Sequence, residues 1–187
     1  MTDPVVTALM SSRALVGEHI AAIAPDDWER STPCGEWDVR SLVNHIVSHE
    51  YRFADNLASN DPSYYVASRN DDFLGDHPLD AWRHGVVLLD HAVKALPSPD
   101  VVINWRVPVP ARTMLAVRVF EAAVHGWDLA TALGRTAVID PLVADLTLPI
   151  LVTMLQDPSM AAFFATPGDS PPSNATSVDK LLHLAGR

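Results

Sequence analysis

The chain has 187 residues, of which 48% are hydrophobic and 19% charged, and its net charge is −10 at neutral pH. This length and composition are typical of one globular domain, so we expect residues 1–187 to form a single domain. The acidic balance excludes a nucleic acid or an anionic membrane as partner, because phosphate binding needs a basic surface. The only cysteine, Cys34, excludes an intrachain disulfide and a cysteine-rich zinc site.

Neither the N-terminal residues nor the most apolar stretch has the pattern of a signal peptide or a membrane span. The N-terminal residues lack the basic and apolar regions of a signal peptide. The most apolar stretch, residues 142–155, is interrupted by Asp145 and Pro149 and is too short to span a bilayer. We therefore expect a cytoplasmic protein without a membrane partner.

Two helices are predicted in the first third of the chain. An apolar stripe at helical spacing covers residues 5–23, after a proline that suits a first turn. A loop rich in proline and glycine follows. Asp38 is then the predicted N-cap of a second helix that ends near residue 59. His45 and His49 lie close to the apolar side of this helix.

The middle of the chain contains a long connection and the clearest core helix. Residues 60–77 are polar and rich in turn formers, and connections of this length are often functional. Residues 78–96 repeat apolar side chains at three- and four-residue steps, which predicts a buried helical stripe. Residues 101–110 have extended character, but their prolines argue against a central strand.

The last part of the chain is also predicted to be helical. Residues 111–133 form the fourth helix, and residues 140–155 form a fifth that is apolar nearly all round and therefore predicted to be buried. A loop rich in proline and serine, residues 168–174, precedes a short helix at 177–184. Helices of this length, with no convincing strand pattern, predict an all-α bundle.

One constellation of residues points to a metal site. Glu121 and His125 are four residues apart, so both project from one face of their helix, and Asp128 continues that face. The best third ligand is His45, with His49 as its competitor one turn later. Imidazole and carboxylate ligands suit Zn²⁺, Fe²⁺, Ni²⁺ or Mn²⁺, and three protein ligands leave the open position that a catalytic site needs.

Each of these residues also has a simpler interpretation. Arg118, three residues before Glu121, could pair with it in a surface salt bridge. His45 could be a hydrogen-bonded core residue rather than a ligand. Asp128 could orient a ligand imidazole or serve only as a helix-packing carboxylate. Cys34 has no base beside it in the sequence, which favours a structural thiol over a nucleophile.

Two segments, Thr32-Pro-Cys-Gly-Glu-Trp-Asp-Val-Arg-Ser-Leu-Val-Asn-His45 and Glu121-Ala-Ala-Val-His-Gly-Trp-Asp-Leu-Ala130, carry a resemblance to a known family. They resemble the actinobacterial metal-binding proteins related to the N-terminal domain of mycothiol-dependent maleylpyruvate isomerase. That family belongs to the DinB-like superfamily of four-helix bundles. The resemblance covers nearly the whole chain and includes residues 72–76 and 180–187.

The resemblance implies a DinB-like four-helix bundle with additional short C-terminal helices. It implies that His45, Glu121 and His125 bind the metal, which is zinc in proteins of this type, and that His49 lines the pocket or has a structural role. It also implies a low-molecular-weight thiol, mycothiol, as co-substrate. Maleylpyruvate isomerase has a second, C-terminal domain, whereas this chain ends soon after the bundle, so the resemblance supports the metal site better than that isomerisation.

Two hypotheses of function follow. In the first, the chain is a metal- and mycothiol-dependent transferase or isomerase that acts on a small electrophile. Coordination to the metal lowers the pKa of a thiol and presents a thiolate at neutral pH. In the second, the chain is a non-catalytic bundle that binds a metal or ligand for a structural or sensing role. A homodimer formed through an apolar helix face is an additional hypothesis.

Overall fold

The computed structural model describes residues 3–35, 37–156, 171 and 173–187, and the described chain is mainly helical. The helices are α1 (Pro4–Ile20), α2 (Val39–Ser59), α3 (Ser63–Ala67), α4 (Pro78–Ala95), α5 (Ala111–Ala132), α6 (Pro141–Leu155) and α8 (Ser177–Leu184). Short 3₁₀ turns cover Pro25–Asp27 and Ser68–Asn70. The all-α prediction is confirmed.

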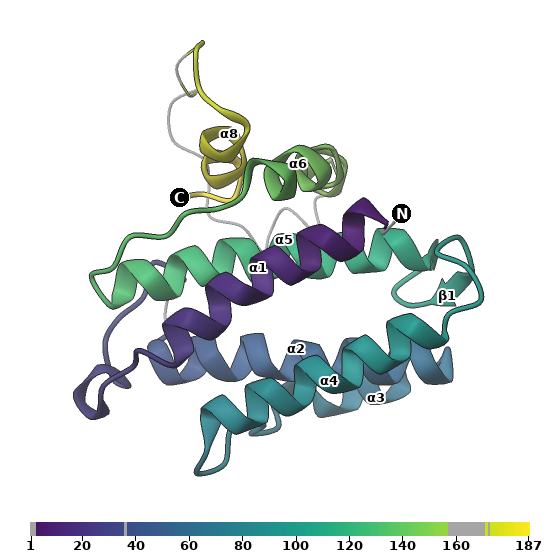
Figure 1. Cartoon of the computed structure of the whole chain (residues 1–187), viewed down its shortest axis with the longest axis horizontal. Helices are drawn as coiled ribbons and strands as arrows, with labels where there is room; N and C mark the ends of the chain where they lie inside the picture. The colour runs from purple at the N-terminus through teal and green to yellow at the C-terminus, as the bar shows by residue number, and fades with distance from the viewer. Residues whose placement is uncertain (1–2, 36, 157–170, 172) are drawn as a thin grey trace.

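Four long helices form the bundle in two layers (Figure 1). Helix α1 packs along α5 in one layer, and α2 packs along α4 in the other. Helices α6 and α8 lie beyond the α1–α5 layer, on the side away from α2 and α4. The two layers meet where α2 contacts α5, and this contact positions the candidate site.

Local sequence signals begin the helices as expected. The Asp38 carboxylate accepts a hydrogen bond of 2.7 Å from the backbone N–H of Ser41 and caps α2. The Asp140 carboxylate accepts one of 2.9 Å from the N–H of Leu142 and caps α6 in the same way. Such caps satisfy backbone donors that have no partner within the first helical turn. The starts of these helices are therefore determined locally.

A buried network of charged side chains joins all four helices of the bundle. The Glu50 carboxylate of α2 accepts hydrogen bonds from Arg13 of α1 and from Arg118 of α5. Arg13 also lies 2.7 Å from Asp90 of α4. Glu50 is fully buried and Arg118 is 1% exposed. Because a buried ion stabilises the fold only while it is paired, the network ties the two layers together.

Gly85 allows α4 to approach α2 closely beside this network. A Cβ atom at Gly85 would lie 2.8 Å from Cβ of Glu50 and 2.9 Å from the ring of Tyr51, which is closer than carbon atoms can pack. The absence of a side chain at Gly85 is therefore a condition for the packing of the α2–α4 layer.

A small hairpin occupies part of the segment that was expected to be only extended. Strands β1 (Val102–Asn104) and β2 (Pro108–Pro110) pair antiparallel. Asn56 donates a hydrogen bond of 2.8 Å to the carbonyl of Asn104, and the side chain of Asn60 accepts one of 2.6 Å from its N–H. These two asparagines at the end of α2 fix the hairpin against the bundle.

The expectation that residues 140–155 are buried all round is wrong. In α6 only Val143, Ala144, Thr147 and Leu151 are buried, and Val152 is 44% exposed. The helix lies outside the bundle and contacts α5, α1 and α8, and these contacts leave part of its surface exposed among the described residues. Among the described residues, no helix combines the length and apolar character needed to cross a membrane. Most of the predicted 168–174 loop lies outside the described residues.

Candidate metal centre

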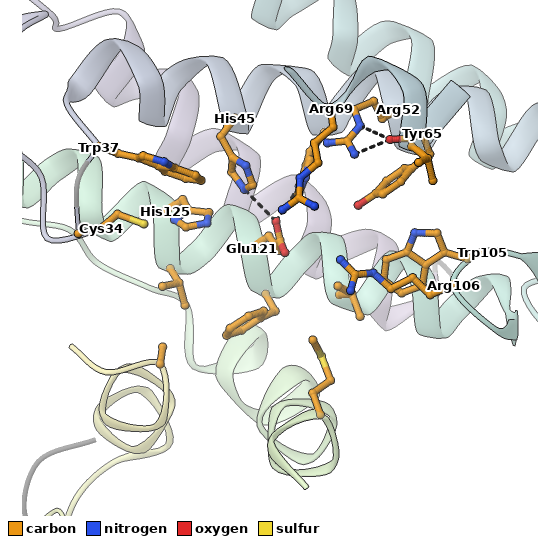
Figure 2. A pocket seen from close by; sticks show the side chains of 18 of the residues that line it. Cys34, Trp37, His45, Arg52, Tyr65, Arg69, Trp105, Arg106, Glu121 and His125 are labelled. Carbon is orange, nitrogen blue, oxygen red and sulfur yellow. Dashed lines mark hydrogen bonds and ion pairs between the residues drawn. The ribbon is translucent and has the colours of Figure 1, made fainter. Parts of the chain in front are cut away.

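Helices α2 and α5 bring the three predicted metal ligands together (Figure 2). His45 projects from α2, while Glu121 and His125 project from one face of α5. One ligand atom of each residue lies within 4.8 Å of the ligand atoms of the other two. The proximity of these side chains is thus a property of the fold and not only of the four-residue spacing.

The distance between the ligand atoms of His45 and Glu121 is compatible with a tetrahedral metal ion. Nε2 of His45 lies 3.3 Å from Oε2 of Glu121. Two ligand atoms held about 2.0–2.1 Å from a zinc ion at a tetrahedral angle would themselves be about 3.3 Å apart. Two imidazoles and one carboxylate are a donor set that suits zinc and neighbouring divalent ions, and three ligands leave a position for a small molecule.

The protonation states of the first two ligands also suit a metal. Burial and the neighbouring His49 lower the pKa of His45 to about 3, so its imidazole is neutral at pH 7. Burial acts to raise the pKa of Glu121, but the adjacent imidazoles of His49 and His45 hold it well below its ordinary value. A neutral imidazole and an ionised carboxylate are the forms that bind metal.

His125 is oriented by a buried carboxylate. Its Nδ1 lies 3.0 Å from Oδ2 of Asp128, which also accepts hydrogen bonds of 2.7 Å from Nε and Nη2 of Arg187 through its two oxygens. Burial disfavours the imidazolium, but hydrogen bonds with Asp128 and Cys34 outweigh it and raise the pKa of His125 to about 9. At neutral pH this pKa leaves the imidazole protonated on both nitrogens. Because the Asp128 carboxylate holds the Nδ1 proton, Nε2 is the nitrogen that would exchange its proton for a metal ion.

This arrangement predicts the effect of replacing Asp128 by asparagine. The amide of Asp128→Asn can donate to Nδ1 of His125 and so favours the wrong tautomer, and the variant leaves Arg187 without its counter-ion. Zinc affinity, measured by competition with a chromophoric chelator, should fall about 10–100-fold. The control is Asp140→Asn at the start of α6, which should keep the wild-type affinity; equal affinities in the two variants would contradict a positioning role for Asp128.

His49, the competitor for the third ligand position, lies next to Glu121. Its Nδ1 is 2.6 Å from Oε2 of Glu121, although the angle is not that of a hydrogen bond. The ring is 4.1 Å from the ring of His45 between centroids, and the side chain is 7% exposed. Burial lowers the pKa of His49, so this imidazole is neutral as well. His49 thus forms part of the cavity wall beside the three candidate ligands.

The alternative of a surface ion pair between Arg118 and Glu121 is wrong. Arg118 is 1% exposed and pairs with the buried Glu50. Glu121 instead faces His45 and His49. The three-residue spacing of Arg118 and Glu121 did suggest a contact, but the rotation between these positions is enough to direct Arg118 into the interior.

The loop before α2 forms one end of the site. The backbone N–H of Cys34 donates to Oγ1 of Thr32 over 3.1 Å, and the Thr32 hydroxyl donates to the carbonyl of Trp37 over 2.8 Å. This turn places the Trp37 ring 4.6 Å from the ring of His45. It also brings the Cys34 thiol to His125, so an imidazole lies beside the cysteine although none is near it in sequence.

The three candidate ligands line a cavity of about 860 Å³ that extends well beyond them. The other end of the cavity is lined by residues outside the predicted site, namely Arg52, Tyr65, Arg69, Trp105 and Arg106. Arg52 carried a usable signal, because it lies seven residues after His45 and therefore on the same face of α2. The others come from the α2–α4 connection and the hairpin, whose positions depend on tertiary contacts.

Comparison with known proteins gives matches over most of the chain. The family model described as the mycothiol maleylpyruvate isomerase N-terminal domain matches residues 9–130. Two uncharacterized proteins of Mycobacterium tuberculosis, from strains CDC 1551 / Oshkosh and ATCC 25618 / H37Rv, are each 26% identical over 128 residues, which is 67% of this chain and 65% of theirs. A further uncharacterized protein of the H37Rv strain is 25% identical over 146 residues, covering 70% of this chain and 57% of its own.

The chain thus spans less than two thirds of the length of these relatives. No solved structure gives a significant match. The family match runs from α1 to α5 and includes His45, Glu121 and His125, whereas α6 and α8 lie outside it. The all-α bundle is the DinB-like architecture that the resemblance implied. Because the family model covers more than half of the sequence, the chain belongs to the family of the mycothiol maleylpyruvate isomerase N-terminal domain.

Proposed function

We propose that this chain binds a divalent metal ion, zinc, through His45, Glu121 and His125 and uses it to activate a low-molecular-weight thiol such as mycothiol. The thiol would add to a small electrophile, giving transfer or isomerisation. The observation that carries the proposal is the convergence of three ligand atoms within 4.8 Å at the wall of a large cavity. Family membership supports the same reading.

The chemistry that the ion supplies is a lower pKa for a coordinated thiol, so that thiolate is present at neutral pH. The side chains of the protein prepare the site for it. Glu121 contributes the negative charge among the three ligands, and Asp128 holds the Nδ1 proton of His125, so that Nε2 is the nitrogen that gives up its proton to a metal. The ring of Trp37 packs against that of His45, with centroids 4.6 Å apart. A cavity of about 860 Å³ has room for a thiol and a second small molecule.

The whole activity, its substrates and a cytoplasmic location belong to this proposal, since the relatives are uncharacterized and longer than the matched segment. We also propose that the chain binds neither nucleic acid nor membranes. The net charge of −10 supports that part, because anionic polymers and surfaces would be repelled.

The proposal is tested by the thiol dependence of conjugation. Zinc-loaded and metal-free protein are each mixed with mycothiol and a chromogenic chloronitrobenzene, in which the thiolate carbon–sulfur bond forms as chloride leaves. The zinc-loaded protein should accelerate the reaction, with saturation in thiol, and the metal-free protein should not. A rate equal to that of the uncatalysed thiol in both samples would contradict the enzymatic proposal.

A second candidate is a non-catalytic metal-binding bundle, and His49 is the observation that favours it. Its Nδ1 lies 2.6 Å from Oε2 of Glu121, so a fourth protein ligand is at hand to close the site. Removal of the metal discriminates between the two. A structural ion should be needed for folding, so the metal-free protein would lose its helical circular dichroism, whereas a catalytic ion leaves an intact bundle.

A further inference from the structure

The charges that line the cavity are the opposite of those on the chain as a whole. Of the 13 lysine and arginine residues in the sequence, four line the cavity, namely Arg52, Arg69, Arg106 and Arg187. Among the described lining residues, Glu121 is the only acidic one, although the sequence contains 23 acidic residues. Among the residues that the structure describes, the lining of the cavity thus carries more positive than negative side chains, although the sequence as a whole is acidic.

The charge of Arg187 is matched by the carboxylate of Asp128. Its Nε and Nη2 each donate to the Asp128 carboxylate over 2.7 Å. In this bidentate pair, the guanidinium of Arg187 holds the carboxylate that orients His125. The end of the cavity that could hold a ligand is therefore the other one, which is lined by Arg52, Arg69 and Arg106.

Arg52 is a buried cation without a counter-ion among the described residues. It is 5% exposed, and its Nε donates to the carbonyl of Tyr65 over 2.8 Å while the guanidinium lies 4.1 Å from the centre of the Tyr65 ring. Neither contact supplies negative charge, and no described carboxylate lies within ion-pair distance. A buried charge that is not paired is costly to a fold. The cost would be offset by an anion bound in the cavity.

Arg69 and Arg106 reach the same end of the cavity from two separate loops. Figure 2 shows them with Arg52 on the side of Glu121 away from Cys34. Arg69 follows α3, and none of the described acidic residues lies within ion-pair distance of it. Arg106 lies in the loop of the hairpin, which asparagines fix to the end of α2. Two segments that are far apart in sequence thus place arginines at the same end of the cavity.

This end is separated from the metal ligands by about the length of a small metabolite. Arg52 follows His45 by seven residues on α2, which corresponds to about 10 Å along the helix. The rings of Tyr65 and Trp105 lie edge to face with centroids 6.0 Å apart and line the same end of the cavity as the arginines. A small molecule held at the arginines could therefore reach the metal ligands through the cavity.

We propose that Arg52, Arg69 and Arg106 form an oxyanion subsite, which holds a carboxylate or phosphate group of the small-molecule substrate at the end of the cavity away from Cys34. Guanidinium groups match both kinds of oxyanion by paired hydrogen bonds. The assignment of the bound molecule as the electrophile rests on the proposed function, while the binding of an oxyanion does not. The α2–α4 connection and the hairpin then act as specificity elements on a common helical frame.

The test is a calorimetric titration of metal-free protein with succinate, with inorganic phosphate and with the uncharged succinamide, in a phosphate-free buffer. Removing the metal prevents the oxyanions from binding to it directly. At least one oxyanion should bind, and succinamide should not. Arg69→Gln and Arg106→Gln should each weaken binding about tenfold or more, because each removes a charged hydrogen-bond donor. The relative affinities of succinate and phosphate identify the preferred group.

The matched control is Arg83→Gln, which removes an equal charge from an exposed position on α4 outside the cavity and should leave the affinity unchanged. Equal binding of succinate and succinamide, no binding of either oxyanion, or unchanged affinity in the double variant Arg69→Gln/Arg106→Gln would each overturn the subsite. If the purified protein contains no metal but still binds an oxyanion through Arg69 and Arg106, the proposed function fails and the subsite stands.

Discussion

Replacing Glu50 by glutamine is expected to lower the free energy of unfolding by about 3–5 kcal/mol, because the variant leaves buried guanidinium groups without their counter-charge. Glu50 is fully buried and accepts hydrogen bonds from both Arg13 and Arg118, so the loss affects three helices at once. Urea unfolding at pH 7, followed by tryptophan fluorescence, measures it. Asp80→Asn, which breaks an exposed ion pair on α4, is the control and should change stability by less than about 0.5 kcal/mol.

Glu50→Gln should also make the free energy of unfolding depend less on pH under acidic conditions. Burial acts to raise the pKa of Glu50, but the charges of Arg118 and Arg13 outweigh it and lower the pKa below its ordinary value. A lowered pKa in the folded state means that the stabilisation is complete above the unfolded pKa of about 4.3 and is lost as the pH falls through the folded value. The difference between wild type and Glu50→Gln should therefore narrow below about pH 4.3. A constant difference down to pH 3 would contradict this.

The second large effect is expected at the metal ligands. Glu121→Gln and His45→Ala should each reduce zinc affinity by more than about 100-fold, which exceeds the effect of losing a partner outside the ligand set. Both side chains lie at the cavity wall and are 23% exposed, so the helical circular dichroism should remain. Elemental analysis and chelator competition give the affinities. His91→Ala, exposed on α4, is the control for simple loss of a histidine; metal content equal to wild type in His45→Ala would remove that residue from the site.

The helices were predictable because their signals are local. Asp38 and Asp140 cap α2 and α6 as their positions in sequence suggest, and the terminal helix has the predicted bounds, Ser177–Leu184. Spacing alone placed Glu121 and His125 on one face of α5. The choice of His45 over His49 needed the family resemblance, since a one-turn spacing gives both histidines the same face of α2.

The environment of the site was not predictable from local pattern. Arg187 reaches Asp128 from 59 positions away, and Arg106 is positioned by contacts of Asn104 with the end of α2. Arg118 shows the opposite failure, because its spacing from Glu121 suggested a local pair whereas its true partner, Glu50, is 68 positions away. Electrostatic partners of this kind are determined by how helices cross, which short-range periodicity does not encode.

Elemental analysis of the wild-type protein, purified without a polyhistidine tag or chelators, tests the metal site most directly. We expect close to one zinc or other divalent transition ion per chain, bound through His45, Glu121 and His125. A protein that contains no such ion, even after reconstitution with zinc, would contradict the metal centre and leave these three residues as ordinary lining of an anion-binding cavity.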